Sequence, residues 1–254
     1  MLTILTPSKT MNFTTPAPAY ALASTPHFNS EATVLRARVA KLSADQVRTL
    51  MKVSDELAEK TQQMYKSPLE KQAFWAYDGD VFKGVQASTL SEEDSAFAQT
   101  HVVVPSAIYG LVRPYDLISP YRLEMKAKLP VGESKDLYAF WGDKLGRYVE
   151  EKAAGEILML SSYEYARTIL AHVSKMTKIV TPAFIDKKPS GKEAQVAIYN
   201  KMMRGVMARW VIDHRIDTLG AISSFTAHGY AYDAARSTEL APVFYRHHMT
   251  PLKF

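Results

Sequence analysis

A helix predicted over residues 200–216 brings cations together on one face. At about 100° per residue, Lys201, Arg204 and Arg215 share this face with Gly205. Because glycine has no side chain, a phosphate or a nucleic-acid backbone could approach the cations closely there. The pattern is equally typical of a solvated basic face on which Gly205 serves helix packing, and the sequence does not separate the two interpretations.

Two predicted strands end in short loops that are rich in hydroxyl groups. One loop carries Lys9 after the strand at 3–5, and the other carries Ser162 and Glu164 after the strand at 156–160. Hydroxyl and charged side chains at strand ends often line ligand crevices. Lys9 lacks the glycines of a phosphate-binding P-loop. In either loop taken alone, such hydroxyl groups more often bond to backbone amides of the turn than to a ligand.

The irregular centre of the chain, residues 105–121, combines prolines, glycine and tyrosines with Arg113, and Arg122 follows it. Arginine beside tyrosine suits phosphate contact and base stacking. It equally suits a structural ion pair, for example between Arg113 and Asp116. The carboxylates that qualify as general acids or bases are Asp78, Asp80, Asp136, Asp143 and Glu164.

Several kinds of site are excluded by composition. The chain has no cysteine, which excludes disulfides, cysteine-ligated zinc, iron–sulfur clusters and a thiol that reacts with peroxide. No H-E-x-x-H spacing is present, so we expect no metal and no cofactor. No apolar run approaches the roughly 20 residues that span a bilayer. The first residues do not resemble a signal peptide, and the cytoplasm is therefore the expected location.

The positive charge is concentrated in the second half of the chain. Lys and Arg number 31 against 26 Asp and Glu, which gives a net charge of +5. Residues 1–127 hold 13 of each sign, whereas residues 166–215 hold ten basic and three acidic side chains. Such an excess favours a polyanion or a phosphate-bearing partner. The lysines of 187–192 are explained more simply by a solvated turn.

The elements that position these residues follow from apolar periodicity and breakers. Helices are expected at 31–42, 44–64, 68–76, 91–99, 136–152 and 200–216. Strands are expected at 3–5, 101–104, 156–160, 179–185, 194–199, 220–225 and 242–245. No internal repeat or low-complexity linker is present. We therefore predict one mixed α/β (α+β) domain over residues 1–254.

Six collinear stretches together resemble signatures of the bacterial YaaA peroxide-stress family. Three of them, P-Y-R-L-E-M at 120–125, K-D-L-Y-x-F-W-G-D at 135–143 and T-P-S-K-T at 6–10, include Arg122, Lys135 and Lys9. The others are D-G-D-V-F-K-G at 78–84, L-S-S-Y-E-Y at 160–165 and the segment 201–209; Y-G-L-V-R-P at 109–114 precedes P-Y-R-L-E-M.

This resemblance implies a cytoplasmic bacterial protein that protects cells under hydrogen peroxide and limits damage from intracellular iron. It also implies DNA binding through a positively charged cleft and a helix-hairpin-helix-like element, in the single-domain α/β architecture called the cantaloupe fold. Ala107 stands where the family has glycine, and glycine is preferred in a turn that presents backbone amides to phosphate. Whether residues 105–112 form a helix-hairpin-helix turn is therefore not decided by the sequence.

Two hypotheses about function follow, from different classes. The first is a protein that binds duplex DNA non-specifically through its phosphates. Its expected ligands are Lys9, Arg113, Arg122, Lys135, Ser162, Lys201, Arg204 and Arg209. The second is an enzyme that acts on a phosphorylated or nucleotide-like small molecule in the same cleft. Its candidate catalytic residues are Lys9, Lys135 and Glu164, with Glu164 as general base.

Direct iron sequestration is the weakest hypothesis, because the ferritin-like Glu-x-x-His spacing is missing. An effect on iron could instead be indirect, through a partner or through protection of DNA. The sequence assigns no reaction and indicates no stable protein partner.

Overall fold

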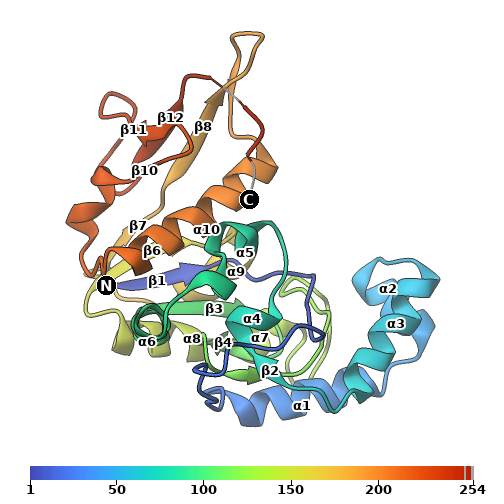
Figure 1. Ribbon diagram of the computed structural model, residues 1–254. Helices are drawn as coiled ribbons and strands as arrows, with labels where there is room; N and C mark the ends of the chain where they lie inside the picture. Colours follow the sequence, from blue (N-terminus) through green and yellow to red (C-terminus); the bar gives the residue numbers. More distant parts are fainter. Residues whose placement is uncertain (249, 253–254) are drawn as a thin grey trace.

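The computed structural model describes residues 1–248 and 250–252, and its architecture is mixed α/β, as predicted. Two five-stranded sheets form the framework, and α10 (Ala197–Asp213) packs between them (Figure 1). A separate pair of short strands, β2 (Lys71–Gln72) and β5 (Leu117–Ile118), lies beside the first sheet.

The first sheet has the order β4-β3-β1-β6-β7, with β1 (Leu2–Leu5) at its centre. β1 runs parallel to β3 and β6, and Leu5 is in register with Leu160. Every residue of β1 is buried, as expected for a strand covered on both faces. The other strands are β3 (Val102–Ser106), β4 (Gly110–Val112), β6 (Glu156–Leu160) and β7 (Lys178–Val180). The carboxyl ends of β1 and β6 therefore lie side by side.

The second sheet has the order β10-β11-β12-β8-β9. Its two inner strands, β12 (Val243–Arg246) and β8 (Ala183–Lys187), are parallel although they lie far apart in the sequence. A buried ion pair joins Arg246 to Asp186, which also accepts a hydrogen bond from Tyr230. The outer strands are β9 (Glu193–Ala194), β10 (Thr226–Ala227) and β11 (Tyr230–Tyr232).

Helices surround the first sheet and form an arm at one end of the molecule. Figure 1 shows α2 and α3 in this arm, away from both sheets. The α-helices are α1 (Asn29–Ala40), α2 (Ala44–Met51), α3 (Asp55–Lys66), α4 (Ala73–Ala76), α5 (Asp80–Val85), α6 (Glu92–His101), α7 (Leu137–Trp141), α8 (Lys144–Lys152) and α9 (Tyr163–Leu170). Two 3-10 helices span Ala87–Thr89 and Leu219–Ser224.

Three predicted elements are divided in the structure. The helix expected at 44–64 is two helices, because Lys52 adopts a left-handed conformation and Ser54 caps α3. The helix expected at 136–152 breaks at Gly142, which has a φ of 50°. The strand expected at 179–185 contains Pro182, which lacks a backbone N–H, and becomes β7 and β8 of different sheets.

Three further expected elements differ in type. Residues 68–76, expected as a helix, form β2 followed by the one-turn helix α4. The strand expected at 194–199 ends at Ala194, and α10 begins at Ala197. The strand expected at 220–225 is a 3-10 helix. Short apolar runs of this kind do not distinguish strand from helix by periodicity.

Residues 105–112 do not form a helix-hairpin-helix turn. They form the antiparallel hairpin between β3 and β4, with Ser106 paired to Gly110. Its turn is buried, and the Trp141 indole N–H donates to the Ala107 carbonyl at 3.1 Å. A side chain at Gly110 would collide with Trp141. This turn therefore presents no amides to an external phosphate.

Gly205 serves packing and not phosphate access. A β-carbon built there would lie 1.8 Å from the Val81 carbonyl oxygen of α5. The facing Gly84 has the same requirement, since its β-carbon would lie 2.3 Å from the Met202 carbonyl oxygen. The two glycines let α5 and α10 pack backbone against backbone. The interpretation of Gly205 as an open floor between cations is therefore wrong.

Candidate functional site

The loop after β1 is held in place by hydrogen bonds to the segment before α5. The Ser8 hydroxyl donates to the Asp78 carbonyl at 3.0 Å and accepts from the Thr10 amide, and the Asp78 amide donates to the Thr10 carbonyl at 2.9 Å. A β-carbon at Gly79 would lie 2.2 Å from the Ser8 hydroxyl oxygen. The T-P-S-K-T and D-G-D-V-F-K-G motifs are therefore hydrogen-bonded to each other, and these bonds fix the backbone that carries Lys9.

Glu164 reaches the same place from the neighbouring strand. It lies in the first turn of α9, directly after β6, and Ser162 is the residue before that helix. One carboxylate oxygen of Glu164 accepts from the Lys126 backbone amide at 3.2 Å, and the other lies 3.7 Å from the Lys126 ammonium. Parallel strands thus bring Lys9 and Glu164 to one edge of the sheet.

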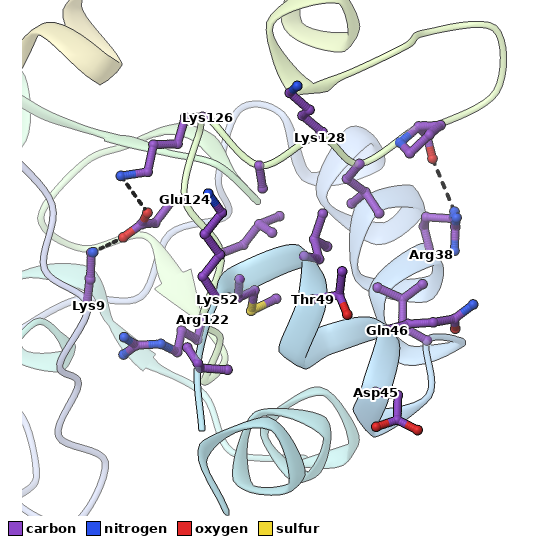
Figure 2. A pocket seen from close by; sticks show the side chains of 18 residues that line it. Lys9, Arg38, Asp45, Gln46, Thr49, Lys52, Arg122, Glu124, Lys126 and Lys128 are labelled. Atoms are coloured by element: carbon purple, nitrogen blue, oxygen red, sulfur yellow. Dashed lines mark hydrogen bonds and ion pairs between the residues drawn. The ribbon is translucent and has the colours of Figure 1, made fainter. Parts of the chain in front are cut away.

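The segment after β5 supplies the third wall of the site. Over residues 121–129 the side chains alternate between buried and accessible, so Arg122, Glu124, Lys126 and Lys128 all face the same side. Glu124 is in contact with the ammonium of Lys9 through one carboxylate oxygen, and its other oxygen lies 3.0 Å from the Lys126 ammonium. Figure 2 shows Lys9 and Lys126 on either side of Glu124.

The surroundings of Lys9 lower the pKa of its ammonium below the ordinary value. Partial burial is the largest cause, and the nearby cations Lys126 and Arg122 add to it. Glu164 acts in the opposite direction, and Lys201 on α10 lowers the pKa slightly more. We name Lys9, Arg122, Glu124, Lys126 and Glu164 the Lys9 cluster.

The Lys9 cluster forms one end of a groove of about 1010 Å³. The other end lies between α1, α2 and residues 127–130, and Asp45 sits there far from Lys9 (Figure 2). Two acidic side chains, Asp45 and Glu124, line the groove. Its cationic side chains are Lys9, Arg38, Lys52, Arg122, Lys126 and Lys128. The groove therefore has a strong positive excess on which phosphate groups could be held.

Two arginines, Arg122 of the Lys9 cluster and Arg204 of α10, have no side-chain hydrogen bond or ion pair among the described residues. Arg204 is half-buried, and its pKa is lowered by burial. At the end of β6, the buried Ser161 hydroxyl also lacks a hydrogen-bond partner among the described residues. Unpaired groups of this kind can receive an anion.

Other predicted ligands lie elsewhere, in contacts within the protein. Arg113 makes a forked contact with the buried Asp116 and donates to the Thr25 carbonyl. Arg209 donates to the backbone of the segment after α5, to the Thr89 hydroxyl and to Asp213. Both guanidinium groups therefore hold elements together.

The remaining predicted cations differ in position. Lys135 is exposed just before α7, where Asp136 caps the helix by accepting from the Ala139 amide. Lys201 is exposed on α10 and close enough to affect Lys9. Arg215 pairs with Asp94 at 2.7 Å and does not line the groove.

Four cations of the groove were not predicted from the sequence: Arg38, Lys52, Lys126 and Lys128. For the last two a signal was present. Residues 122–128 alternate charged and apolar side chains, and this alternation predicts an extended segment with its charges on one side. Arg38 and Lys52 carried no such signal, because their approach to this segment depends on how α1 and α2 are placed.

Comparison with known proteins matches residues 1–236 to the family described as peroxide stress protein YaaA. The chain belongs to the YaaA family. A UPF0246 protein of Burkholderia cenocepacia is 39 % identical, and the alignment covers 97 % of this chain and 98 % of the relative. UPF0246 proteins of Burkholderia lata and Burkholderia vietnamiensis are each 38 % identical over the same shares. The family that the sequence motifs indicated is thereby confirmed, and its general role is in peroxide stress.

Two further observations bear on the kind of site. No group of three or more His, Asp or Glu side chains in the described part of the chain is placed to hold a metal ion. None of the helices among the described residues is long and apolar enough to cross a membrane.

Proposed function

We propose that this member of the YaaA family binds duplex DNA through its phosphates, without selecting bases, in the groove next to the Lys9 cluster. By covering DNA in the cytoplasm, the protein would limit oxidative and iron-dependent damage to it. The observation that supports this most strongly is the charge of the groove, where six cations face two carboxylates. Such contacts hold the phosphate backbone and carry no base information.

The cations come from both walls of the groove, as a phosphate backbone requires. Arg38 and Lys52 belong to α1 and the end of α2, whereas Lys126 and Lys128 belong to the extended segment opposite. Flexible, exposed lysines of this kind can follow a backbone of variable sequence. Another phosphate-bearing polyanion would satisfy the same contacts.

The test is a titration of a random-sequence duplex, followed by fluorescence anisotropy at two salt concentrations. Each phosphate contact that a variant removes should reduce the slope of log K against log salt by about 0.9. We expect Lys52→Ala/Lys128→Ala to weaken binding and to reduce the slope. The matched control is Lys187→Ala/Lys188→Ala, which removes the same charge from the end of β8 and the residue after it, outside the groove. Equal weakening in both variants, or binding insensitive to salt, would contradict the proposal.

A second candidate function is an enzyme that acts on a phosphorylated or nucleotide-like small molecule. The observation that favours it is the unpaired state, among the described residues, of Arg204 and of the buried Ser161 hydroxyl near the ends of the parallel strands. Lys201→Ala/Arg204→Ala separates the two functions. Loss of nucleotide binding with duplex binding retained would favour the enzyme.

A further inference from the structure

Lys9 differs from the other lysines of the groove in its surroundings, which exceed what a side chain needs in order to bind phosphate. Its ammonium contacts Glu124, and the Glu124 carboxylate is also held by Lys126. The loop that carries Lys9 is fixed on both sides by the hydrogen bonds of Ser8 and Thr10. A primary amine is thus held beside a carboxylate, at the end of a groove that would contain the phosphate backbone.

Burial and the neighbouring cations Lys126 and Arg122 lower the pKa of the Lys9 ammonium below its ordinary value, whereas contact with the Glu124 carboxylate favours the charged form. Loss of one proton from this ammonium gives the reactive amine. The Lys9 side chain is still 58 % exposed and can be reached from the groove. An uncharged lysine amine is a nucleophile toward carbonyl carbons and forms imines with them.

We propose that Lys9 forms an imine with the ring-opened aldehyde of an abasic deoxyribose in duplex DNA, and that Glu124 then assists cleavage of the strand. The proposal rests on the proposed function, since the groove must first hold the duplex. An abasic sugar is the chemistry that fits, because it presents an aldehyde within an otherwise ordinary phosphate backbone.

The step balances without an oxidant or a reductant. The Lys9 nitrogen attacks C1′ of the aldehyde, and the two amine hydrogens leave with the carbonyl oxygen as water. The imine takes a proton from solvent, and Glu124 removes a proton from C2′. The electron pair of that C–H bond forms the C2′–C3′ double bond, while the C3′–O bond breaks and the 3′ phosphate leaves with its electrons. Water then hydrolyses the protonated imine, which releases the unsaturated aldehyde and restores Lys9, and Glu124 gives the proton that it took from C2′ to solvent.

The experiment is borohydride trapping with a duplex that contains one abasic site. Borohydride reduces an imine to a stable amine, so the wild-type protein should form a covalent one-to-one adduct with the DNA. Peptide mass spectrometry should place the adduct on Lys9. Lys9→Arg keeps a cation but has no primary amine, and we expect the adduct to disappear. Lys188→Arg, at the residue after β8 and outside the groove, is the matched control and should still be trapped.

Glu124→Gln gives an independent readout. It keeps the shape of the side chain but removes the base, so we expect the adduct to form and strand cleavage without borohydride to be abolished. If Lys9→Arg fails to fold, as circular dichroism would show, the location of the wild-type adduct decides the question.

Binding of the intact duplex, measured in the same buffer, separates this inference from the function on which it rests. Binding without an adduct would overturn the inference and leave the proposed function standing. An adduct on Lys52, Lys126 or Lys128 would also overturn it, because any exposed lysine in the groove could then react. If the protein bound neither the intact duplex nor the duplex with an abasic site, both the inference and the proposed function would be overturned.

Discussion

The absence of a side chain at Gly79 lets the loop that carries Lys9 close against the segment before α5. A β-carbon at this position would lie 2.2 Å from the Ser8 hydroxyl oxygen. That hydroxyl cannot move freely, because it donates to Asp78 and accepts from Thr10. The position of the Lys9 amine therefore depends on a residue that does not touch it.

Gly79→Ala should displace this loop and destabilise the protein by about 1–3 kcal/mol, the usual cost of overpacking. We expect weaker duplex binding as well, because Lys9 moves with the loop. The double variant Gly79→Ala/Ser8→Ala removes the oxygen that collides and should recover part of the stability. Urea unfolding measures both. No recovery in the double variant would show that the collision is not the cause.

Asp94 combines two stabilising roles at the start of α6. It completes a capping box with Ser91 and pairs with Arg215 at 2.7 Å. Burial raises the pKa of its carboxyl, but the hydrogen bonds from Ser91 and Arg215 outweigh burial, and the net pKa is below the ordinary value. Because the folded pKa is lowered, the stabilisation is present above the unfolded pKa of about 3.9 and is lost as the pH falls through the folded pKa.

Asp94→Asn should therefore cost about 1.5–3 kcal/mol at pH 7, the value of a hydrogen bond to a charged group. The difference from the wild type should begin to shrink below about pH 4, where Asp94 of the unfolded chain takes up a proton, and should vanish as the pH falls through the lowered pKa of the folded state. Urea unfolding from pH 7 to pH 3 checks this. A difference that stayed constant with pH would show that the charge of Asp94 is not responsible.

At the residue scale, sequence motifs identified Lys9, Arg122 and Glu164, which the structure brings into one cluster. Motifs could not distinguish a free arginine from one that holds two elements together. Arg113 and Arg209 were predicted to bind phosphate, and each makes several contacts within the protein. That distinction depends on which groups the folded chain places near each arginine, and the residue type alone does not give this information.

At the scale of elements, α5 and α10 approach each other so closely that their backbones touch. Gly84 and Gly205 face each other there, and neither position has room for a methyl group. Sequence periodicity predicted a helix over residues 200–216. It did not show which helix would cover Gly205, because α5 is short and its sequence has no clear period.

Gly205→Ala should destabilise the protein by roughly 1–3 kcal/mol through overpacking. The sign of the change in stability is informative, because in an exposed helix alanine stabilises the helix relative to glycine by about 1 kcal/mol. Gly220→Ala is the control, since a β-carbon there meets no atom within 4 Å and the backbone is not left-handed. Thermal unfolding measures both variants. Stabilisation by Gly205→Ala would contradict the packing of α5 against α10.

Apolar periodicity placed most strands and helices but merged those that are divided by one residue. Lys52 divides α2 from α3 by adopting a left-handed conformation, which lysine seldom does. The local signal for the break is Ser54, a preferred N-cap residue that is followed by Asp55 and Glu56 in the first turn of α3. The break matters for the groove, because the end of α2 directs Lys52 toward residues 122–128.

At the scale of the whole molecule, the charge count and the lining of the groove point to different halves of the chain. The positive excess lies in residues 128–254, yet five of the six cations of the groove come from residues 1–127, which are neutral in sum. Several cations of the second half are paired with carboxylates, among them Lys178, Arg209 and Arg236. The first half places five of its 13 basic side chains on the groove but only two of its 13 acidic ones.

The position of β12 within the second sheet determines when that sheet can form during protein synthesis. In the described part of the chain β12 is the last strand to be made, yet it lies between β11 and β8. Until residue 246 has left the ribosome, Asp186 lacks its arginine partner, and β10 and β11 have no strand to join them to β8. The first sheet needs no residue beyond Val180. A nascent chain can therefore assemble the parallel sheet and the Lys9 cluster while the second sheet still waits for its last strand.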